Sequence, residues 1–474
     1  MPAQKRSVSV CLEGKNSRRG LGFMVKNIFE NKKGKNWKKL ICVLLSASVI
    51  SAGCGEKNNE DVNSGTQPTI EVTQGSKEPT KAADAAEPTK AADSTEPTKE
   101  AVGDTAEPTK GASEDVAEPT KEAVAMRDMT TMEYVQSLGV GINLGNTFES
   151  CGFESTTVTG YETGWGSPAI TPKILEGYAK CGFGVMRIPV AWSNLMGDDY
   201  TINEKYLKRV KSVVDCVLNN DMCVILNIHW DGGWWTGFSE PDKKDECMYK
   251  YERIWTQLTE AFGDYDDRLM FESLNEEGCW ENIWNRYGGT QGKEEAYALL
   301  NEINQKFVDI VRGSGGNNAL RHLLIAGYAT DIELTCDELF LMPQDPAGRM
   351  AVSVHYYTPS TFAILDEDAS WGKMQPDWGT EEEYEALYKN MDMMKEHFID
   401  KGIPVIVGEF GSATKNKVEG AVNRYLTAVC DAAYRRGLCP VLWDVTNVFY
   451  NRNAAKFIDE ELLSGLMSVL EIER

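Results

Sequence analysis

Two glutamates lie near the ends of short apolar runs, where a carboxyl group could act in acid–base or nucleophilic chemistry. Glu276 lies in the run 269–277 and Glu409 in the run 404–411. Cleavage of a glycosidic bond passes through an oxocarbenium-like state and requires two carboxyl groups that flank the bond. A lone glutamate at a strand end is usually a solvated or capping residue. The pair is therefore informative only if the fold brings both residues to one place.

Short apolar runs alternate with longer amphipathic segments after residue 126. The predicted strands are 140–146, 185–192, 223–231, 269–277, 322–330, 350–358, 404–411 and 439–447. The predicted helices, in which apolar residues recur at i, i+3, i+4 and i+7, are 204–220, 249–262, 294–312, 381–401 and 420–436. Such alternation implies parallel strands joined by helical crossovers. Eight units predict an α/β fold, a closed (β/α)₈ TIM barrel. An open doubly wound sheet is the alternative, but no GxGxxG or GxxxxGK[ST] motif follows any of these strands.

Functional groups of a TIM barrel gather at the C-terminal ends of its strands. Polar and aromatic residues accumulate at the corresponding positions of this sequence. These candidates are Asn143, Arg187, His229, Trp230, Asn275, Glu276, His355, Tyr357, Glu409 and Trp443. Strands four and seven lie on opposite sides of an eight-stranded barrel. We therefore expect Glu276 and Glu409 to face each other across its mouth.

The ordered set of motifs resembles glycoside hydrolase family five, the large family that contains cellulases. The resemblance rests on LNE at 274–276 and IVGEFG at 406–411, and it continues through GINLGN at 141–146, RIPV at 187–190, IHW at 228–230, HYY at 355–357 and Trp443. It covers essentially all of residues 130–474. One departure is Glu277, which stands where the family usually has proline. We expect its side chain to point away from Glu276, because successive strand residues alternate faces.

The resemblance implies a retaining double displacement, with Glu276 as general acid/base and Glu409 as nucleophile. It implies that Arg187 and Tyr357 keep Glu409 ionised, since a cation and a hydrogen-bond donor both favour the carboxylate. Asn275 would bind the 2-hydroxyl of the attacked sugar. The remaining expected substrate-binding residues are Asn143, His229, Trp230, His355 and Trp443, of which Trp443 would be the stacking floor. Glu272 is expected to pair inside the barrel.

The activity that the resemblance implies is endo-β-1,4-glucanase on cellulose or a related β-glucan. A β-mannanase or xyloglucanase of the same family is the alternative. A different class, the lipid-anchored sugar-binding protein of a transporter, would be two-lobed and would need no paired carboxylates. Tryptophans in the predicted loops could stack on sugar rings in an open cleft. These candidate platforms are Trp165, Trp230, Trp234, Trp235, Trp280 and Trp284.

The charge and histidine content limit the partners. The net charge is −23, which would repel the phosphates of nucleic acid and excludes it as an expected partner. The four histidines are scattered and show no metal-ligand spacing. We therefore expect no cofactor and no metal. The resemblance implies a β-glucan polysaccharide as substrate, and we expect a monomeric protein.

The first 125 residues have the composition of an export signal and a linker. Residues 1–54, with a possible start at Met24, carry a basic run at 32–39, an apolar run at 40–50 and a small-residue site before Cys54. An apolar run of about 11 residues is too short to span a bilayer, which takes about 20, so a cleaved signal is predicted. Ala-Gly-Cys at 52–54 resembles a bacterial lipobox, which would make Cys54 the lipidated N-terminus and anchor the protein to the membrane at the cell surface. Simple secretion after cleavage is the alternative.

Residues 55–125 repeat Glu-Pro-Thr-Lys five times. Low hydrophobicity with high charge and recurrent proline predicts a disordered, extended linker. Residues 126–474 are then the predicted catalytic domain.

Overall fold

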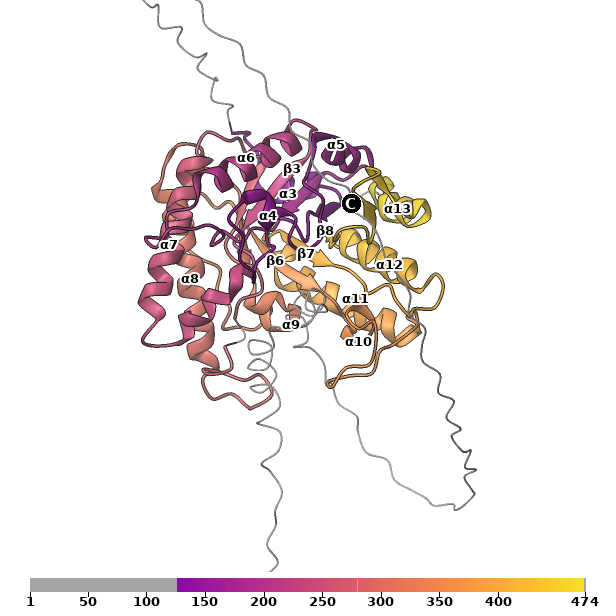
Figure 1. Cartoon of the computed structure of the whole chain (residues 1–474). Coiled ribbons are helices and arrows are strands. Elements are labelled where there is room, and N and C mark those ends of the chain that lie inside the picture. Colours follow the sequence, from indigo (N-terminus) through magenta and orange to yellow (C-terminus); the bar gives the residue numbers. More distant parts are fainter. Residues whose placement is uncertain (1–125, 279, 473–474) are drawn as a thin grey trace, which may run out of the picture. The chain divides into compact units, whose positions relative to one another are not determined.

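The computed structural model describes residues 126–278 and 280–472. Within them, parallel strands β1 to β8 pair in sequence order, and β8 closes onto β1 to form a barrel (Figure 1). The strands are β1 (Gly141–Asn143), β2 (Val185–Ile188), β3 (Cys223–Asn227), β4 (Leu269–Glu272), β5 (Leu323–Ala326), β6 (Met350–Tyr356), β7 (Val405–Phe410) and β8 (Cys439–Leu442). The predicted (β/α)₈ class is confirmed. The signal and linker predicted for residues 1–125 lie outside the described residues.

Helices surround the barrel on its outer side (Figure 1). The α-helices are α3 (Thr131–Ser137), α4 (Val158–Glu162), α5 (Pro172–Lys180), α6 (Glu204–Leu218), α7 (Lys244–Ala261), α8 (Lys293–Gly313), α9 (Ile332–Thr335), α10 (Ser360–Ala363), α11 (Glu381–His397), α12 (Ala421–Arg435) and α13 (Glu460–Met467). The 3₁₀ helices are η2 (Asp231–Ser239), η3 (Gly316–Ala319), η4 (Tyr328–Thr330), η5 (Ile399–Lys401) and η6 (Ser468–Glu471). Strands β9 (Tyr450–Asn451) and β10 (Lys456–Phe457) form a small antiparallel pair.

Side-chain caps explain where several helices begin. Thr130 and Thr380 each form a capping box with the glutamate three residues later, at the starts of α3 and α11, which satisfies backbone donors that a helix leaves unpaired. Asn203 caps α6. The sequence analysis missed α5, which has only nine residues and therefore shows barely two turns of periodicity.

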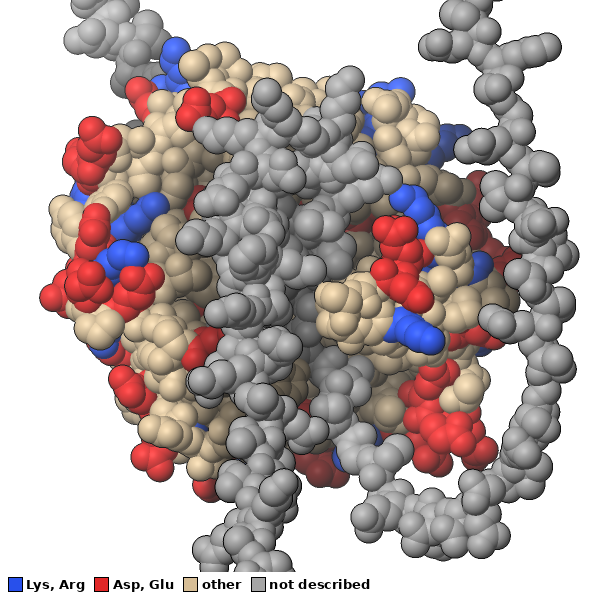
Figure 2. Space-filling view, turned by 60° about the horizontal axis from the view of Figure 1, so that its bottom comes forward, with Lys and Arg blue, Asp and Glu red and all other residues tan. Residues whose placement is uncertain are grey.

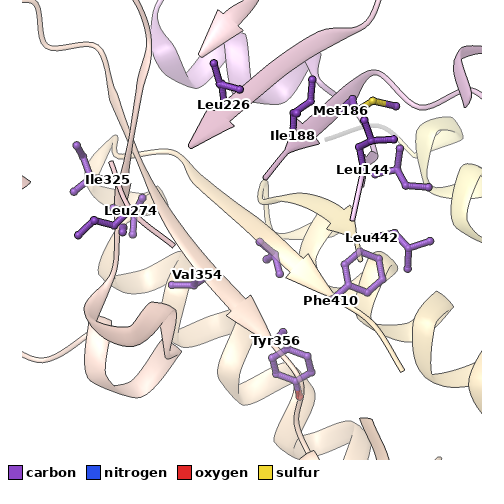
Figure 3. Packing of buried hydrophobic residues seen from close by; sticks show 14 of the residues in the cluster. Leu144, Met186, Ile188, Leu226, Leu274, Ile325, Val354, Tyr356, Phe410 and Leu442 are labelled. Carbon is purple, nitrogen blue, oxygen red and sulfur yellow. The ribbon is translucent and has the colours of Figure 1, made fainter. Parts of the chain in front are cut away.

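The outward faces of the strands pack against the surrounding helices. Figure 3 shows Met186, Ile188, Leu226, Ile325 and Val354 among the side chains of this layer, all of them buried. Burial of aliphatic side chains contributes about 25 cal/mol per Å² of apolar surface. This layer holds the strands rigidly, which is what a site at their ends requires.

The inside of the barrel changes from apolar to polar along the strands. At its N-terminal end, an apolar cluster is formed by Tyr134, Val135, Leu138, Val185, Ile225, Met270, Leu324, Ala351, Ile406, Cys439 and Val441. The first three of these belong to α3 and its C-terminal cap, so α3 closes this end. Two residues further along four strands, the inward positions are occupied by Arg187, Asn227, Glu272 and Ser353, each fully buried. The polar layer leads to the strand ends, where the site residues lie.

Acidic side chains predominate over basic ones on the face shown in Figure 2, in line with the net charge of −23. Among the described residues, no helix has both the length and the apolar character needed to cross a membrane.

Candidate active site

The two glutamates singled out from the sequence lie next to each other in the structure. Glu409 is on β7, paired in register with His355 on β6 after a shift in the β6–β7 ladder. Strand β4 ends at Glu272, and Glu276 lies in the segment that follows it. One donor atom each of Glu276, His355 and Glu409 lies within 4.8 Å of the other two. Within the described residues, these three are also the group whose donor atoms come close enough to hold a metal ion.

Arg187 on β2 connects most of the site. Its Nε donates to Oε2 of Glu272 at 2.7 Å, and its Nη1 donates to Oε1 of Glu409 at 2.7 Å. Nη1 also donates to Oδ1 of Asn143 at 3.1 Å, and Nη2 to Oδ1 of Asn275 at 2.8 Å. Burial disfavours a charged guanidinium, but the two carboxylates more than compensate and raise the pKa of Arg187. The arginine therefore stays charged at the centre of the network.

Glu409 accepts hydrogen bonds from a cation and from a phenol. Besides Arg187, Tyr357 Oη donates to its Oε2 at 2.9 Å. Burial raises the pKa of Glu409 above its usual value, and the contacts with Arg187 and Tyr357 limit that rise. The contacts that favour a carboxylate are therefore concentrated on this glutamate.

Glu276 has a different environment. Its Oε1 lies 2.8 Å from Nδ1 of His355. Burial raises the pKa of Glu276 to about 8; Glu272 adds to the rise and Arg187 opposes it. Burial also lowers the pKa of His355 to about 4. Glu276 is therefore protonated and His355 neutral at neutral pH. The side chain of Glu276 retains 12% exposure, so a substrate can reach it.

Two further predicted site residues form a stacked pair above β3 and β8. The rings of His229 and Trp443 are 5.7 Å apart and nearly parallel, at 7°. Burial, together with Arg187, lowers the pKa of His229 well below its usual range, so this ring is neutral. Trp443 is partly exposed, and its side chain lies 3.2 Å from where a Cβ on Gly411 would be. A side chain at 411 would therefore crowd the Cβ of Trp443.

Asn143 and Arg187, both named among the substrate-binding residues, are fully buried, and Arg187 contacts Glu409 as the resemblance implied. The Asn143 amide donates to the carbonyls of Gly408 and Leu442, at 2.9 and 3.3 Å, and its Oδ1 accepts from Arg187. These bonds point into the barrel. The geometry gives both residues the task of holding other side chains in place.

Trp230 packs inside its own loop. Its ring meets Trp235 edge-on at 5.3 Å, and its carbonyl accepts from Nε1 of Trp235 at 3.2 Å. Gly232 and Gly233 adopt positive φ angles of 74° and 75°, a conformation that glycine adopts without steric cost. The glycines thus turn the loop and allow Trp235 to meet Trp230 edge-on.

Three of the six candidate tryptophans are packing residues. Trp235, Trp280 and Trp284 are buried, with at most 7% exposure. Trp165 and Trp234 are partly exposed, and their indoles donate to Cys151 O and Asp231 Oδ2 respectively. Sequence position in a loop did not distinguish these cases, because the loops after β3 and β4 fold back onto the barrel.

The sequence analysis missed one member of the network, Ser353. It named Glu272 and Glu277 but not their hydrogen-bond partners. Ser353 on β6 donates to Oε1 of Glu272 at 2.7 Å. Its position two residues before His355 was an available signal, because strand residues two apart share a face. Glu272 pairs inside the barrel, where it was expected. Glu277 is buried and accepts from the backbone N–H of Asn275 at 2.5 Å, which fixes the turn that carries Glu276.

Comparisons with known proteins agree with this geometry. The model of the cellulase family, glycosyl hydrolase family 5, matches residues 148–448. Endoglucanase A of Paenibacillus barcinonensis is 34% identical over 353 residues, which cover 68% of this chain and 84% of the relative. A xyloglucan-specific endo-beta-1,4-glucanase of Bacteroides ovatus is 32% identical over 368 residues, covering 73% of this chain and 71% of the relative. The solved structure of a GH5-4 broad specificity endoglucanase from an uncultured bovine rumen ciliate is 34% identical and has a TM-score of 0.66. The match covers 72% of this chain and 98% of the chain in that structure.

Proposed function

Since the chain belongs to glycosyl hydrolase family 5, the cellulase family, we propose that it is an endo-acting hydrolase of β-1,4-glucan that works by a retaining double displacement. The observation that carries the proposal is the meeting of Glu276 and Glu409, from opposite sides of the barrel, with donor atoms within 4.8 Å. Retaining enzymes hold the two carboxyl groups about 5–5.5 Å apart, whereas inverting enzymes leave about 6.5–9.5 Å for a water molecule.

The neighbours of the two carboxyl groups support one assignment of roles. Glu409 is the nucleophile, because Arg187 and Tyr357 favour its ionised form. Glu276 is the general acid, because its pKa of about 8 keeps it protonated at neutral pH. After the leaving group departs, Glu276 has lost its proton and can activate the water that releases the sugar from Glu409.

Five other residues are placed to bind the sugar at the cleavage point. The Oδ1 of Asn275 is bound by Arg187, which leaves its amide N–H groups to donate to the 2-hydroxyl. Trp443 offers a partly exposed ring as the stacking floor, with His229 beside it. His355 and Tyr357 contact the two glutamates and complete the subsite.

The proposed substrate is the backbone of cellulose or a related β-glucan. This rests on the relative named endoglucanase A. Xyloglucan is the second candidate, because one relative is named as a xyloglucan-specific enzyme and a similar solved structure as a broad specificity endoglucanase. The alternative of a sugar-binding protein of a transporter predicted two lobes, and the closed barrel is not that architecture.

The experiment is an assay of reducing ends and viscosity on carboxymethylcellulose and xyloglucan. The wild-type chain should lower the viscosity strongly while few reducing ends have been released, because internal cuts shorten a polymer most. Glu409→Gln should be inactive, and Glu396→Gln, an exposed position on α11, should match the wild type. No release from any β-glucan by the wild type would refute the proposal.

We further propose that the enzyme is exported and held at the cell surface by a lipid on Cys54. Support comes from the basic run, short apolar run and Ala-Gly-Cys pattern of residues 32–54. These residues lie outside the described part of the structure. A monomer is the proposed state in solution.

A further inference from the structure

A third carboxylate lies directly beneath the proposed catalytic pair. Glu272, the last residue of β4, is fully buried, as is Ser353. Oε2 of Glu272 accepts a hydrogen bond from Nε of Arg187, and Oε1 of Glu272 accepts one from Oγ of Ser353, both at 2.7 Å. Neither residue can touch a substrate. Glu272 therefore acts on the reaction through its neighbours, by its contact with Arg187 and by its charge close to Glu276.

Arg187 is held from two sides by opposite charges. Its Nε meets Glu272 and its Nη1 meets Glu409, each at 2.7 Å, and its remaining bonds run to Asn143 and Asn275. We propose that Glu272 is a positioning residue, which fixes the guanidinium between two carboxylates and thereby sets the charge that Glu409 and Glu276 experience. The inference rests on the proposed hydrolysis by these two glutamates.

The charged and titratable groups that face Glu272 come from several elements. Arg187 lies on β2 and His355 on β6, while Glu276 and Glu277 follow β4, and each of these groups interacts electrostatically with Glu272. Glu409 lies on the far side of the guanidinium.

Removal of the charge on Glu272 should change both catalytic carboxyls in one direction. Glu272 raises the pKa of Glu276, so its neutralisation lowers that pKa. Arg187 would then have one carboxylate partner instead of two, and the guanidinium lowers the pKa of Glu409. Both groups should ionise at lower pH, and the whole pH profile should move with them.

The test compares Glu272→Gln with Ser353→Ala by the pH dependence of kcat/KM on a soluble β-glucan. Glu272→Gln keeps the shape of the side chain and removes its charge. We expect both limbs of its profile to move to lower pH by about one unit, with a reduced maximum. Ser353→Ala removes the other hydrogen bond of Glu272 and changes no charge, so its limbs should stay where the wild type has them.

The outcomes separate this inference from the proposed function. Unmoved limbs in a folded Glu272→Gln variant, or an equal shift in Ser353→Ala, would overturn it, because the effect would then come from packing. Thermal unfolding checks the fold. If Glu272→Gln does not fold, Glu272→Asp takes its place, because it moves the charge away from Arg187 by one carbon–carbon bond. Its pH profile should shift in the same direction by a smaller amount. Unmoved limbs in this variant would overturn the inference. An inactive wild type would instead refute the proposed hydrolysis.

Discussion

At the scale of single residues, Glu276 and Glu409 are the same residue type and differ only in their neighbours. Glu409 accepts from Arg187 and Tyr357, both of which favour its charged form. Glu276 meets a neutral imidazole in a buried setting, and its pKa rises to about 8. Environments that separate two carboxyl groups in this way define an acid and a nucleophile.

The assignment of roles predicts different defects in the two glutamine variants. Glu276→Gln should lose roughly 10²–10⁴-fold of its activity on β-glucan, the usual contribution of a general acid. It should still form the glycosyl-enzyme from a 2,4-dinitrophenyl β-cellotrioside, because that leaving group needs no proton. Glu409→Gln should fail on both substrates. A burst of dinitrophenol from Glu409→Gln and none from Glu276→Gln would reverse the roles.

The raised pKa of Glu276 predicts the alkaline limit of activity. A general acid must be protonated, so kcat/KM of the wild type should fall as pH rises through about 8. A pH series on a soluble β-glucan measures the limb. If kcat/KM instead fell near pH 5, the range of an ordinary glutamate, burial would not raise the pKa of Glu276.

Sequence reasoning reached most of these residues and some of their tasks. The resemblance already implied that Arg187 acts on Glu409, whereas the structure adds that Arg187 and Asn143 are fully buried and that Asn143 bonds to backbone carbonyls and to Arg187. Ser353 shares a strand face with His355, two residues away, but a serine at that position does not by itself indicate a bond to a carboxylate. Its importance comes from the buried carboxylate opposite it, which is a contact between distant parts of the chain.

At the scale of elements, the predicted strands all begin close to the observed ones and end too late. Strand β4 stops at Glu272 rather than at residue 277, and β3 stops at Asn227 rather than at 231. Apolar character continues past the last ladder hydrogen bond because the loops also pack against the barrel. Hydrophobic periodicity could therefore place the strands but could not show that Glu276 lies beyond the end of β4.

The segment after β8 carries Trp443 and depends on a buried network. Arg452 donates to Thr147 Oγ1, Ser167 Oγ and Gly145 O, and it lies 4.0 Å from Asp444. Arg452→Ala should lower the free energy of unfolding by about 3–5 kcal/mol, because it leaves Asp444 buried without its cation. Urea unfolding measures this loss.

An exposed arginine provides the matched control for that prediction. Arg435 on α12 pairs with Asp431 at the surface, with half of its side chain exposed. Arg435→Ala should leave the free energy of unfolding close to that of the wild type, because an exposed ion pair contributes little. Equal losses in the two variants would mean that burial of the Arg452 network does not set its contribution.

At the scale of the whole molecule, the barrel supplies the chemistry and the N-terminal region is proposed to supply the location. Substitution Cys54→Ser should release the enzyme from the membrane fraction of a bacterial host, because the lipid-bearing thiol is gone, and leave its specific activity unchanged. Fractionation followed by the carboxymethylcellulose assay measures both. Enzyme in the medium for both wild type and variant would favour simple secretion.

The stereochemistry of the released sugar tests the central claim most directly, that Glu276 and Glu409 act together through a glycosyl-enzyme on Glu409. Proton NMR can follow the anomeric signals during the first minutes of cellotetraose hydrolysis, before mutarotation mixes them. The close approach of the two carboxyl groups predicts that the β-anomer appears first. Initial release of the α-anomer would mean that water attacks the sugar directly, and would contradict the account.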